Sequence, residues 1–405
     1  MMKDRLLIIL ISVFVVVVGI LIYVVNKTSP VDTDITLDSA SFMDTIKKNV
    51  ISNLIDSNAT LNKDYSLKDF YSENIELSKK VEDVFNSLKD EEKIGQMIVV
   101  AAGRYGNPRE DIVKSIKNKR LGGILLLKGS EGEFRNDLTG FIKIAKDNKS
   151  LPLIFSCDAE PSLLNNKIAG SPKMVETSNI KTKEQANKIS NEITNYIKNL
   201  GFHQNYSPVC DFNNNKEIIG DRSFGNNTDK VSELATEFIK TSQDNNIIAT
   251  AKHFPGHGNV KGDSHKGLVT IKGDLLEIDV FRNVIKNNVI SIMVGHIAIA
   301  GNKKYDTGGK PSTISRNIVT DLLKKELNFK GIIITDAMNM KGVSELGSPS
   351  LKAIKAGCDM ILMPTNEEKL IKTVLDECGK DANLRNQITE SVKKIIKLKI
   401  CLGLL

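Results

Sequence analysis

The chain has 405 residues, of which 40% are hydrophobic, and this is enough for one large domain or two of average size. Its formal net charge is +7, but acidic and basic residues are interspersed without a long basic block, which argues against a nucleic-acid-binding protein. The five cysteines include no Cys-x-x-Cys pair, which argues against a zinc ribbon or a redox motif.

The N-terminal segment is apolar enough to predict a membrane-spanning helix. Leu6–Val25 is a nearly unbroken apolar run of 20 residues, and a helix of about 20 residues crosses the hydrocarbon core of a bilayer. Lys3 and Arg5 precede the run, which predicts a cytoplasmic N-terminus and a single-pass cell-membrane protein with the rest of the chain on the extracellular side. A cleaved signal peptide is the alternative, although the run is longer than usual and no small-x-small site follows it.

The next stretch predicts a spacer. Residues 26–78 are rich in Asp, Asn, Ser and Lys, as in segments that separate a folded domain from an anchor. The chain is therefore divided into an anchor at residues 1–25, a spacer at 26–78 and a main domain at 79–405.

The main domain alternates short apolar runs with longer amphipathic stretches, the pattern of parallel strands covered by helices on both faces. Helical spacing is found at Thr182–Leu200, Lys230–Asn245, Leu275–Asn287 and Ser315–Leu327. The predicted strands are Ile94–Ala101, Gly123–Leu127, Leu153–Cys157, His203–Val209, Ile247–Ala251, Ile290–Val294, Gly331–Thr335 and Cys358–Met363. Eight such strands predict an α/β fold: a (β/α)8 TIM-type barrel preceded by an N-terminal transmembrane helix and spacer.

Polar side chains follow several of these strands at the point where each strand ends. They are Asp158, Asp211, the pair Lys252 and His253, then His296 and Asp336. In a parallel barrel the carboxyl ends of all strands meet at one face, where active sites lie, so we expect these side chains to share a cavity. A polar residue could follow one strand by chance and face water, but chance is a poorer explanation for polar residues at the ends of five strands.

A loop rich in histidine and glycine follows the fifth strand and carries two competing chemical interpretations. A metal site would use His253, His257, Asp263 and His265, but Pro255 and the glycines prevent the helix that a His-x-x-x-His pair needs. An acid–base pair would use Asp263 and His265, because a carboxylate bonded to one ring nitrogen raises the basicity of the other. The acid–base interpretation is favoured, and neither a metal nor a cofactor is expected.

Asp336 follows a fully apolar strand, Gly331–Thr335. A carboxylate held in a cavity near cationic partners stays ionised and can act as a nucleophile on an electrophilic carbon.

The ordered motifs together resemble glycoside hydrolase family 3, and within it the bacterial NagZ-like group of β-N-acetylglucosaminidases. The loop sequence Lys-His-Phe-Pro-Gly-His-Gly, followed by Asp-Ser-His, is similar to the signature of that family. Supporting motifs lie in the expected order at residues 88–97, 205–211, 220–225, 292–296 and 335–336. The resemblance covers about Val81 to Leu405.

The resemblance implies a role for each matching residue. Asp336 would form a glycosyl-enzyme, and His265, oriented by Asp263, would act as general acid and then as general base, with net retention of configuration. The residues implied to bind the sugar are Asp158, Arg222, Lys252, His253 and His296. The implied partner is a glycan with terminal β-linked N-acetylglucosamine, such as peptidoglycan or its fragments, besides the membrane reached through the N-terminal helix.

One segment departs from the family pattern, which usually has Asp-Gln-Glu-Gly-Gly and then an arginine about eight residues past the aspartate. Asp158 and Glu160 match this pattern, whereas the glycines are absent and Asn166, beside Lys167, stands at the arginine position. Either Lys167 substitutes for the arginine, or one side of the sugar site differs. The alternatives kept open are a β-glycosidase of another sugar, a non-catalytic wall-binding protein on a degenerate barrel, and transfer to phosphate instead of water.

Overall fold

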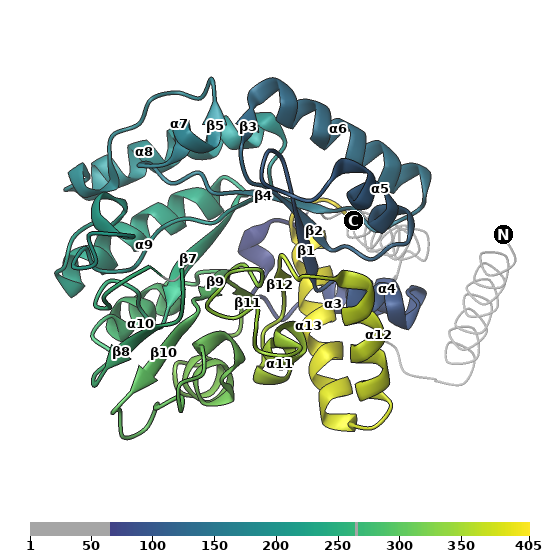
Figure 1. The fold of residues 1–405 in the computed structure, drawn as a ribbon. Helices are drawn as coiled ribbons and strands as arrows, with labels where there is room; N and C mark the ends of the chain where they lie inside the picture. Colours follow the sequence, from purple (N-terminus) through teal and green to yellow (C-terminus); the bar gives the residue numbers. More distant parts are fainter. Residues whose placement is uncertain (1–64, 264–265) are drawn as a thin grey trace, which may run out of the picture. The chain divides into compact units, whose positions relative to one another are not determined.

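The computed structural model describes residues 65–263 and 266–405, and in this part eight parallel strands form one curved sheet (Figure 1). Each of these strands lies beside the next one in the chain, so the strand order around the sheet is the order in the sequence. The strands in this order are β1 (Ile98–Ala102), β2 (Gly123–Leu126), β4 (Ile154–Cys157), β6 (Gln204–Asn205), β7 (Ile248–Phe254), β9 (Ser291–Val294), β11 (Ile332–Thr335) and β12 (Ile361–Leu362).

The sheet is a nearly closed barrel. The first strand pairs with the last, with Ile98 opposite Ile361. On the other side, a parallel bridge joins Ile334 of β11 to Met360, one residue before β12. The strands are buried because their side chains, mostly Ile, Val, Leu and Ala, pack inside the barrel or under the surrounding helices.

Helices cover the outside of the barrel, as Figure 1 shows. Each presents an apolar stripe inward; α8, for example, buries Ile193 and Ile197, and it ends at Leu200 before Gly201, whose φ is 104°. The helical segments are α4 (Asp90–Gly95), α5 (Arg109–Lys117), α6 (Glu131–Asp147), α7 (Leu164–Lys167), α8 (Lys183–Leu200), α9 (Thr228–Asp244), α10 (Ile278–Lys286), π-helical η6 (Asn317–Glu326), α11 (Pro349–Ala356), α12 (Glu367–Cys378) and α13 (Ala382–Cys401), with short 3-10 turns at Thr177–Asn179, Gly220–Arg222 and Ser312–Ile314.

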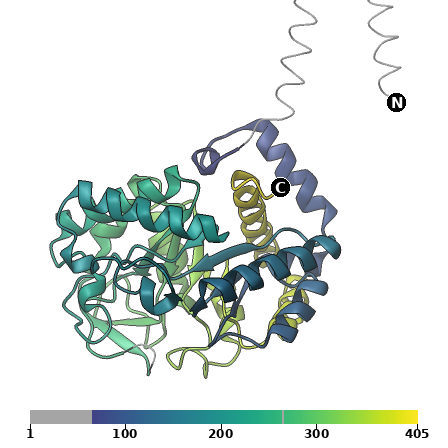
Figure 2. The same cartoon turned by 90° about the horizontal axis from the view of Figure 1, so that it is seen from above.

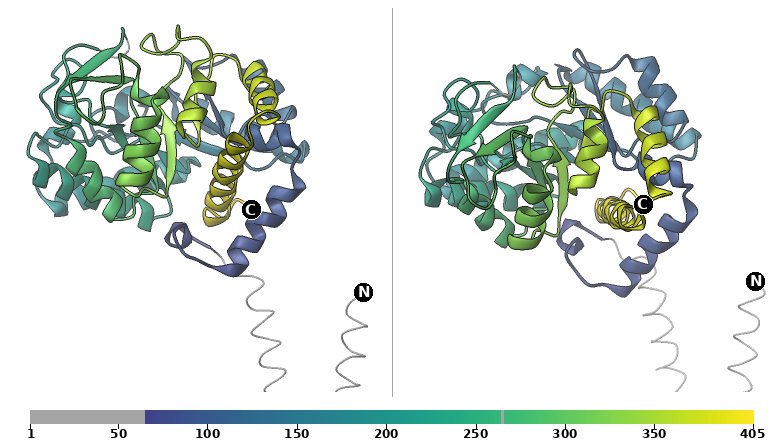
Figure 3. Two further views of the ribbon diagram at one scale, coloured as in Figure 1. Left: turned by 90° about the horizontal axis from the view of Figure 1, so that it is seen from below. Right: turned by 60° about the horizontal axis from the view of Figure 1, so that its bottom comes forward.

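The first described residues pack against the last helix. The turn η2 (Leu67–Asp69) and helix α3 (Ile75–Ser87) both contact α13 (Figures 2 and 3). Tyr65, Leu67 and Phe70 are buried there. The part of the expected spacer from Tyr65 to Ser78 therefore contributes to the core of the barrel domain.

Two short pairs of parallel strands lie outside the barrel and were not predicted. β3 (Gly129–Ser130) pairs with β5 (Ile168–Ala169), and β8 (Val269–Lys272) pairs with β10 (Ile297–Ala300). The four short strands lie in the segments that follow β2, β4, β7 and β9, so each pair joins two loops at the carboxyl ends of the barrel strands.

The prediction of a membrane-anchored fold requires correction. Across residues 65–263 and 266–405, no helix combines the length and the apolar character needed to cross a bilayer. Even the 20-residue helix α13 carries Arg385, Glu390 and Lys393, because its outer face meets water. The same finding contradicts the predicted membrane partner and the predicted single-pass extracellular location. Leu6–Val25, on which these predictions depended, lies outside the described residues.

Candidate active site

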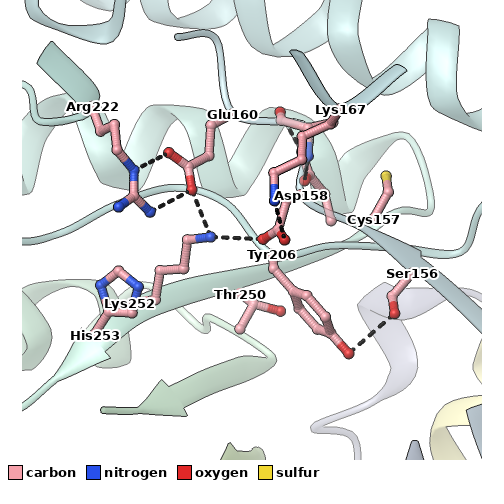
Figure 4. A network of polar contacts seen from close by, with 12 residues as sticks. Ser156, Cys157, Asp158, Glu160, Lys167, Tyr206, Arg222, Thr250, Lys252 and His253 are labelled. Atoms are coloured by element: carbon pink, nitrogen blue, oxygen red, sulfur yellow. Dashed lines mark hydrogen bonds and ion pairs between the residues drawn. The ribbon is translucent and has the colours of Figure 1, made fainter. Parts of the chain in front are cut away.

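Four charged side chains from three separate segments form a buried network at the carboxyl end of the barrel (Figure 4). Lys252 projects from β7, and its Nζ lies 2.9 Å from Asp158 Oδ1 and 2.6 Å from Glu160 Oε1. Arg222 binds the same glutamate in bidentate fashion, with Nε and one terminal nitrogen each 2.8 Å from a Glu160 oxygen. The structure thus brings together the predicted sugar-binding residues Asp158, Arg222 and Lys252.

The network is held in its ionised form. Burial by itself would raise the pKa of Glu160, whose side chain is 1% exposed, but Arg222 and Lys252 outweigh burial and hold that pKa well below its usual range. The charges of Lys252 and Lys167 likewise outweigh burial at Asp158 and lower its pKa. At Lys252, the charges of Asp158 and Glu160 outweigh burial and raise its pKa. Fixed charges in a dry site can orient polar groups of a ligand strongly.

Lys167 stands beside Asn166, the residue at the arginine position where the chain departs from the family pattern. It is the last residue of α7, and its Nζ lies 3.5 Å from Asp158 Oδ2, the carboxylate oxygen that Lys252 leaves free. Its side chain is 28% exposed, against 3% for Lys252. Asp158 is therefore flanked by one buried lysine and one that reaches water.

A second buried carboxylate, Asp211 in the loop after β6, organises the histidine-rich loop. It accepts hydrogen bonds from the backbone N–H groups of His253 and His257, at 3.1 and 2.8 Å, and lies 2.6 Å from His253 Nδ1. Burial would raise the pKa of Asp211, but the His253 ring, the His257 ring and the His253 N–H lower it. The ring of His253 is nearly buried, and it meets the His257 ring edge-on at 5.8 Å.

Glu277, the residue directly before α10, holds the same loop from its other side. Its Oε1 accepts hydrogen bonds of 2.8 Å from the N–H groups of Phe212 and Gly258. The loop needs glycine here, because a Cβ on Gly258 would lie 2.1 Å from the Phe212 oxygen, and one on Gly256 would lie 2.2 Å from Glu277 Oε2. Two buried acidic side chains, Asp211 and Glu277, therefore hold the loop after β7 against the loop after β6.

Glu277 makes the stability of the protein depend on pH. Burial and the nearby Asp211 raise the pKa of Glu277 from 4.5 to about 8. Between these values the folded chain keeps a proton that the unfolded chain has lost, so stability falls as pH rises toward 8. We expect wild type to lose stability relative to Glu277→Gln over this window, with a slope of at most about 1.4 kcal/mol per pH unit. Urea unfolding at several pH values measures this, with exposed Glu110→Gln as control; parallel pH curves for wild type and Glu277→Gln would contradict it.

Asp336 follows β11 and is held by its own backbone neighbours. Its N–H donates to the Val294 oxygen at 2.9 Å, and its Oδ1 accepts from the N–H of Ala337 at 2.8 Å. The carbonyl of Ala337 lies 2.9 Å from Nε2 of His296, whose Nδ1 lies 2.9 Å from the Thr313 hydroxyl. His296 is fully buried, so these contacts support the backbone beside Asp336; its predicted contact with the sugar stays a prediction.

The histidine-rich loop reaches the neighbourhood of Asp336. Burial and the His253 ring lower the pKa of His257, and the charges of Asp211 and Asp336 act against them. Further along this loop, Asp263 Oδ2 lies 3.5 Å from Lys266 Nζ. The predicted acid–base residue His265 lies outside the described residues. No group of three or more His, Cys, Asp or Glu side chains in the described part of the chain could hold a metal ion.

The sequence did not reveal every residue of this cluster. Asp211 was found by its position after a strand but was given no role, and Glu160 was noted only as a match to a motif. Glu277 was missed, because it stands at a helix start whose partners, Phe212 and Gly258, are distant in the chain. An acidic residue at the start of a helix is too common to serve as a signal.

Several known proteins are similar to this chain in fold and in sequence. Residues 90–398 match the family described as "Glycosyl hydrolase family 3 N terminal domain". Beta-hexosaminidase LpqI of Mycobacterium tuberculosis is 30% identical over 71% of this chain and 76% of its own length. Beta-hexosaminidase A of Pseudoalteromonas piscicida is 30% identical over 53% of this chain and 40% of its own length. A solved family 3 beta-N-acetylglucosaminidase from Paenibacillus is 28% identical, with a TM-score of 0.70, over 78% of this chain and 63% of its own.

A parallel α/β barrel with charged residues at the carboxyl ends of its strands is the general plan of a barrel enzyme. The match over most of the chain makes the assignment specific: the chain belongs to glycosyl hydrolase family 3. It spans less than two thirds of the length of the Pseudoalteromonas and Paenibacillus proteins.

Proposed function

We propose that the protein is a retaining exo-β-N-acetylglucosaminidase, which removes terminal β-linked N-acetylglucosamine from glycans such as peptidoglycan fragments. The observation that carries this proposal is the position of Asp336, whose carboxylate is held by the Ala337 N–H after β11. β11 pairs with β9, and β9 pairs with β7, the strand that leads into the histidine-rich loop. The names of the relatives, beta-hexosaminidases and a beta-N-acetylglucosaminidase, support the choice of sugar.

The proposed reaction has two displacements at one carbon. In the first, Asp336 attacks the anomeric carbon, the glycosidic C–O bond breaks, and the leaving oxygen takes a proton from His265. In the second, water gives a proton to His265 and attacks the same carbon, which releases Asp336. Asp263 would orient His265, and no cofactor takes part.

The buried network would bind the sugar. Asp158 and Lys252 offer an acceptor and a donor to sugar hydroxyls, while Arg222 and Glu160 fix their positions. His253, oriented by Asp211, would add a further polar contact. Because these charges are already paired, they need little rearrangement when a sugar binds.

The full chain should release p-nitrophenol from its β-N-acetylglucosaminide at least about 100-fold more efficiently than from the β-glucoside, because groups that hydrogen-bond the acetamide are left unpaired by glucose. Comparison of kcat/KM for the two substrates measures this. Proton NMR of the first-formed sugar should show the β-anomer. Preference for the glucoside, or an α-anomer as the first product, would contradict the proposal.

A further inference from the structure

A small cavity of about 170 Å³ lies between helices α11 and α12, which follow the seventh and eighth strands of the barrel. Residues of the first turn of each helix line it, so both helices begin at this α11–α12 cavity. Its volume is below the range of about 300–1,000 Å³ that is usual for sites enclosing a whole small molecule. The cavity therefore suits a small chemical group rather than a complete sugar ring.

The polar lining of the α11–α12 cavity consists of groups that can donate hydrogen bonds. Ser344 and Ser350 line it from the α11 side, and Thr365 and Lys369 line it from the α12 side. None of the described residues that line it is acidic. Hydroxyl and ammonium groups without a carboxylate among them favour an anionic ligand.

The two glutamates that begin α12 belong to a different cavity. Glu367 accepts a hydrogen bond from the Ser115 hydroxyl, and Glu368 forms a 3.0 Å ion pair with Arg120. All four residues line a cavity beside α5 and not the α11–α12 cavity. These carboxylates are therefore engaged with other partners and do not neutralise the α11–α12 cavity.

Ser350, in the first turn of α11, is a buried polar residue that lines the cavity. It is only 7% exposed, and among residues 65–263 and 266–405 neither its hydroxyl nor its N–H has a hydrogen-bond partner. Ser348, directly before α11, makes no side-chain cap, so the Leu351 N–H likewise has no acceptor in the described chain. The Lys369 ammonium forms no hydrogen bond or ion pair with these residues either. Buried polar groups normally have partners, so a ligand that accepts hydrogen bonds would satisfy this cluster.

We propose that the α11–α12 cavity binds a phosphate group, either as inorganic phosphate or as a phosphate ester of a saccharide. The partial positive charges of two helix N-termini add to the charge of Lys369. A phosphate presents strong acceptor oxygens in several directions, which matches donors that converge from two helices. Parallel barrels frequently bind phosphate at the loops after their seventh and eighth strands. None of the cavity residues takes part in the proposed reaction, so this site does not depend on it.

Titration calorimetry of the full chain at constant ionic strength tests the site, with inorganic phosphate and glucose 6-phosphate as probes and glucose as the uncharged comparison. Wild type should bind at least one of the two phosphates saturably at a single site. Ser350→Ala/Lys369→Gln should bind it at least about tenfold more weakly, because a charge-assisted contact and a hydroxyl donor are lost. Lys188→Gln on α8 removes an exposed lysine outside the cavity and should keep wild-type affinity.

Tighter binding of inorganic phosphate would identify the free ion as the ligand, and tighter binding of glucose 6-phosphate would identify a phosphorylated saccharide. The bound phosphate should also raise the Tm of wild type, and the double variant should lose this rise. Circular dichroism checks that the double variant is folded, and Lys369→Gln alone, an exposed change, provides a milder version of the same test. Absence of saturable binding of both phosphates to wild type, or equal affinity in wild type and the double variant, would overturn the site.

Discussion

Asp336→Asn should lower kcat toward p-nitrophenyl β-N-acetylglucosaminide by about 10³- to 10⁵-fold, the range expected when the attacking group is removed from a covalent mechanism. An amide is too weak a nucleophile to form the glycosyl-enzyme. It can still accept the hydrogen bond from the Ala337 N–H through its oxygen, so the fold around β11 should persist. Initial rates measured with full-chain enzyme, together with circular dichroism and thermal unfolding, separate lost chemistry from lost structure.

The matched control is Asp321→Asn on the outer helix η6, where the carboxylate pairs with Lys325 at the surface. That variant should keep wild-type kcat. A second variant, Asp336→Gly, should regain turnover with azide, which can attack the anomeric carbon from the vacated side and yield the α-glycosyl azide. A fully active Asp336→Asn enzyme would remove Asp336 from the proposed mechanism.

Lys252→Met should lower the free energy of unfolding by about 3–5 kcal/mol, the cost of breaking a buried ion network by removing one partner. Lys252 Nζ lies between Asp158 and Glu160; Lys252 and Glu160 are buried, and Asp158 is partly buried. Without the ammonium, two carboxylates face each other, and only Arg222 and Lys167 remain to compensate. Methionine retains most of the side-chain volume, so the loss reports charge more than packing. Urea denaturation at pH 7 measures it.

Lys167→Met provides the comparison within the same network. Lys167 is 28% exposed and its Nζ is 3.5 Å from Asp158, so its removal should cost less than about 1 kcal/mol, as for other partly solvated pairs. Equal losses for the two variants would mean that burial does not control the strength of these pairs, and the electrostatic description of the site would have to change.

Much of the barrel was predictable because its strands are short apolar runs between helix signals. The starts of β2, β4, β7, β9 and β11 lie within one residue of the predicted ones. β1 begins four residues later than predicted, at Ile98, because Asp90–Gly95 forms α4 and Ile94 is a buried helical residue. A short apolar run has the same appearance in a helix and in a strand, so periodicity alone could not separate them.

Other differences arise from tertiary contacts. β6 is only Gln204–Asn205, and Pro208, which lacks an N–H, follows in the stretch predicted to continue it. β7 continues through Lys252 and His253 to Phe254, although those polar residues were assigned to a loop. They are tolerated in the strand because Lys252 pairs with Asp158 and Glu160, and the His253 ring contacts Asp211. Such partners come from distant strands and are not visible in local sequence.

The candidate site was predictable where a polar residue directly follows a strand, as at Asp158 and Asp336. It was not predictable where a residue acts through backbone groups of another loop. Glu277 is the clearest example, since both of its N–H donors belong to loops that only the fold brings together. His296 illustrates the same limit, because its ring contacts, Thr313 and Ala337, follow it in the chain by several elements.

During synthesis, β1 emerges from the ribosome long before β12, its neighbour in the sheet. Until the C-terminal strand arrives, β1 has one unpaired edge of backbone N–H and C=O groups, and such edges are templates for association with other chains. Helix α13, which covers α3 and η2, arrives later still. The nascent chain therefore completes its barrel only after β12 has been synthesised, so we expect truncations before β12 to aggregate during expression rather than accumulate as a smaller folded domain.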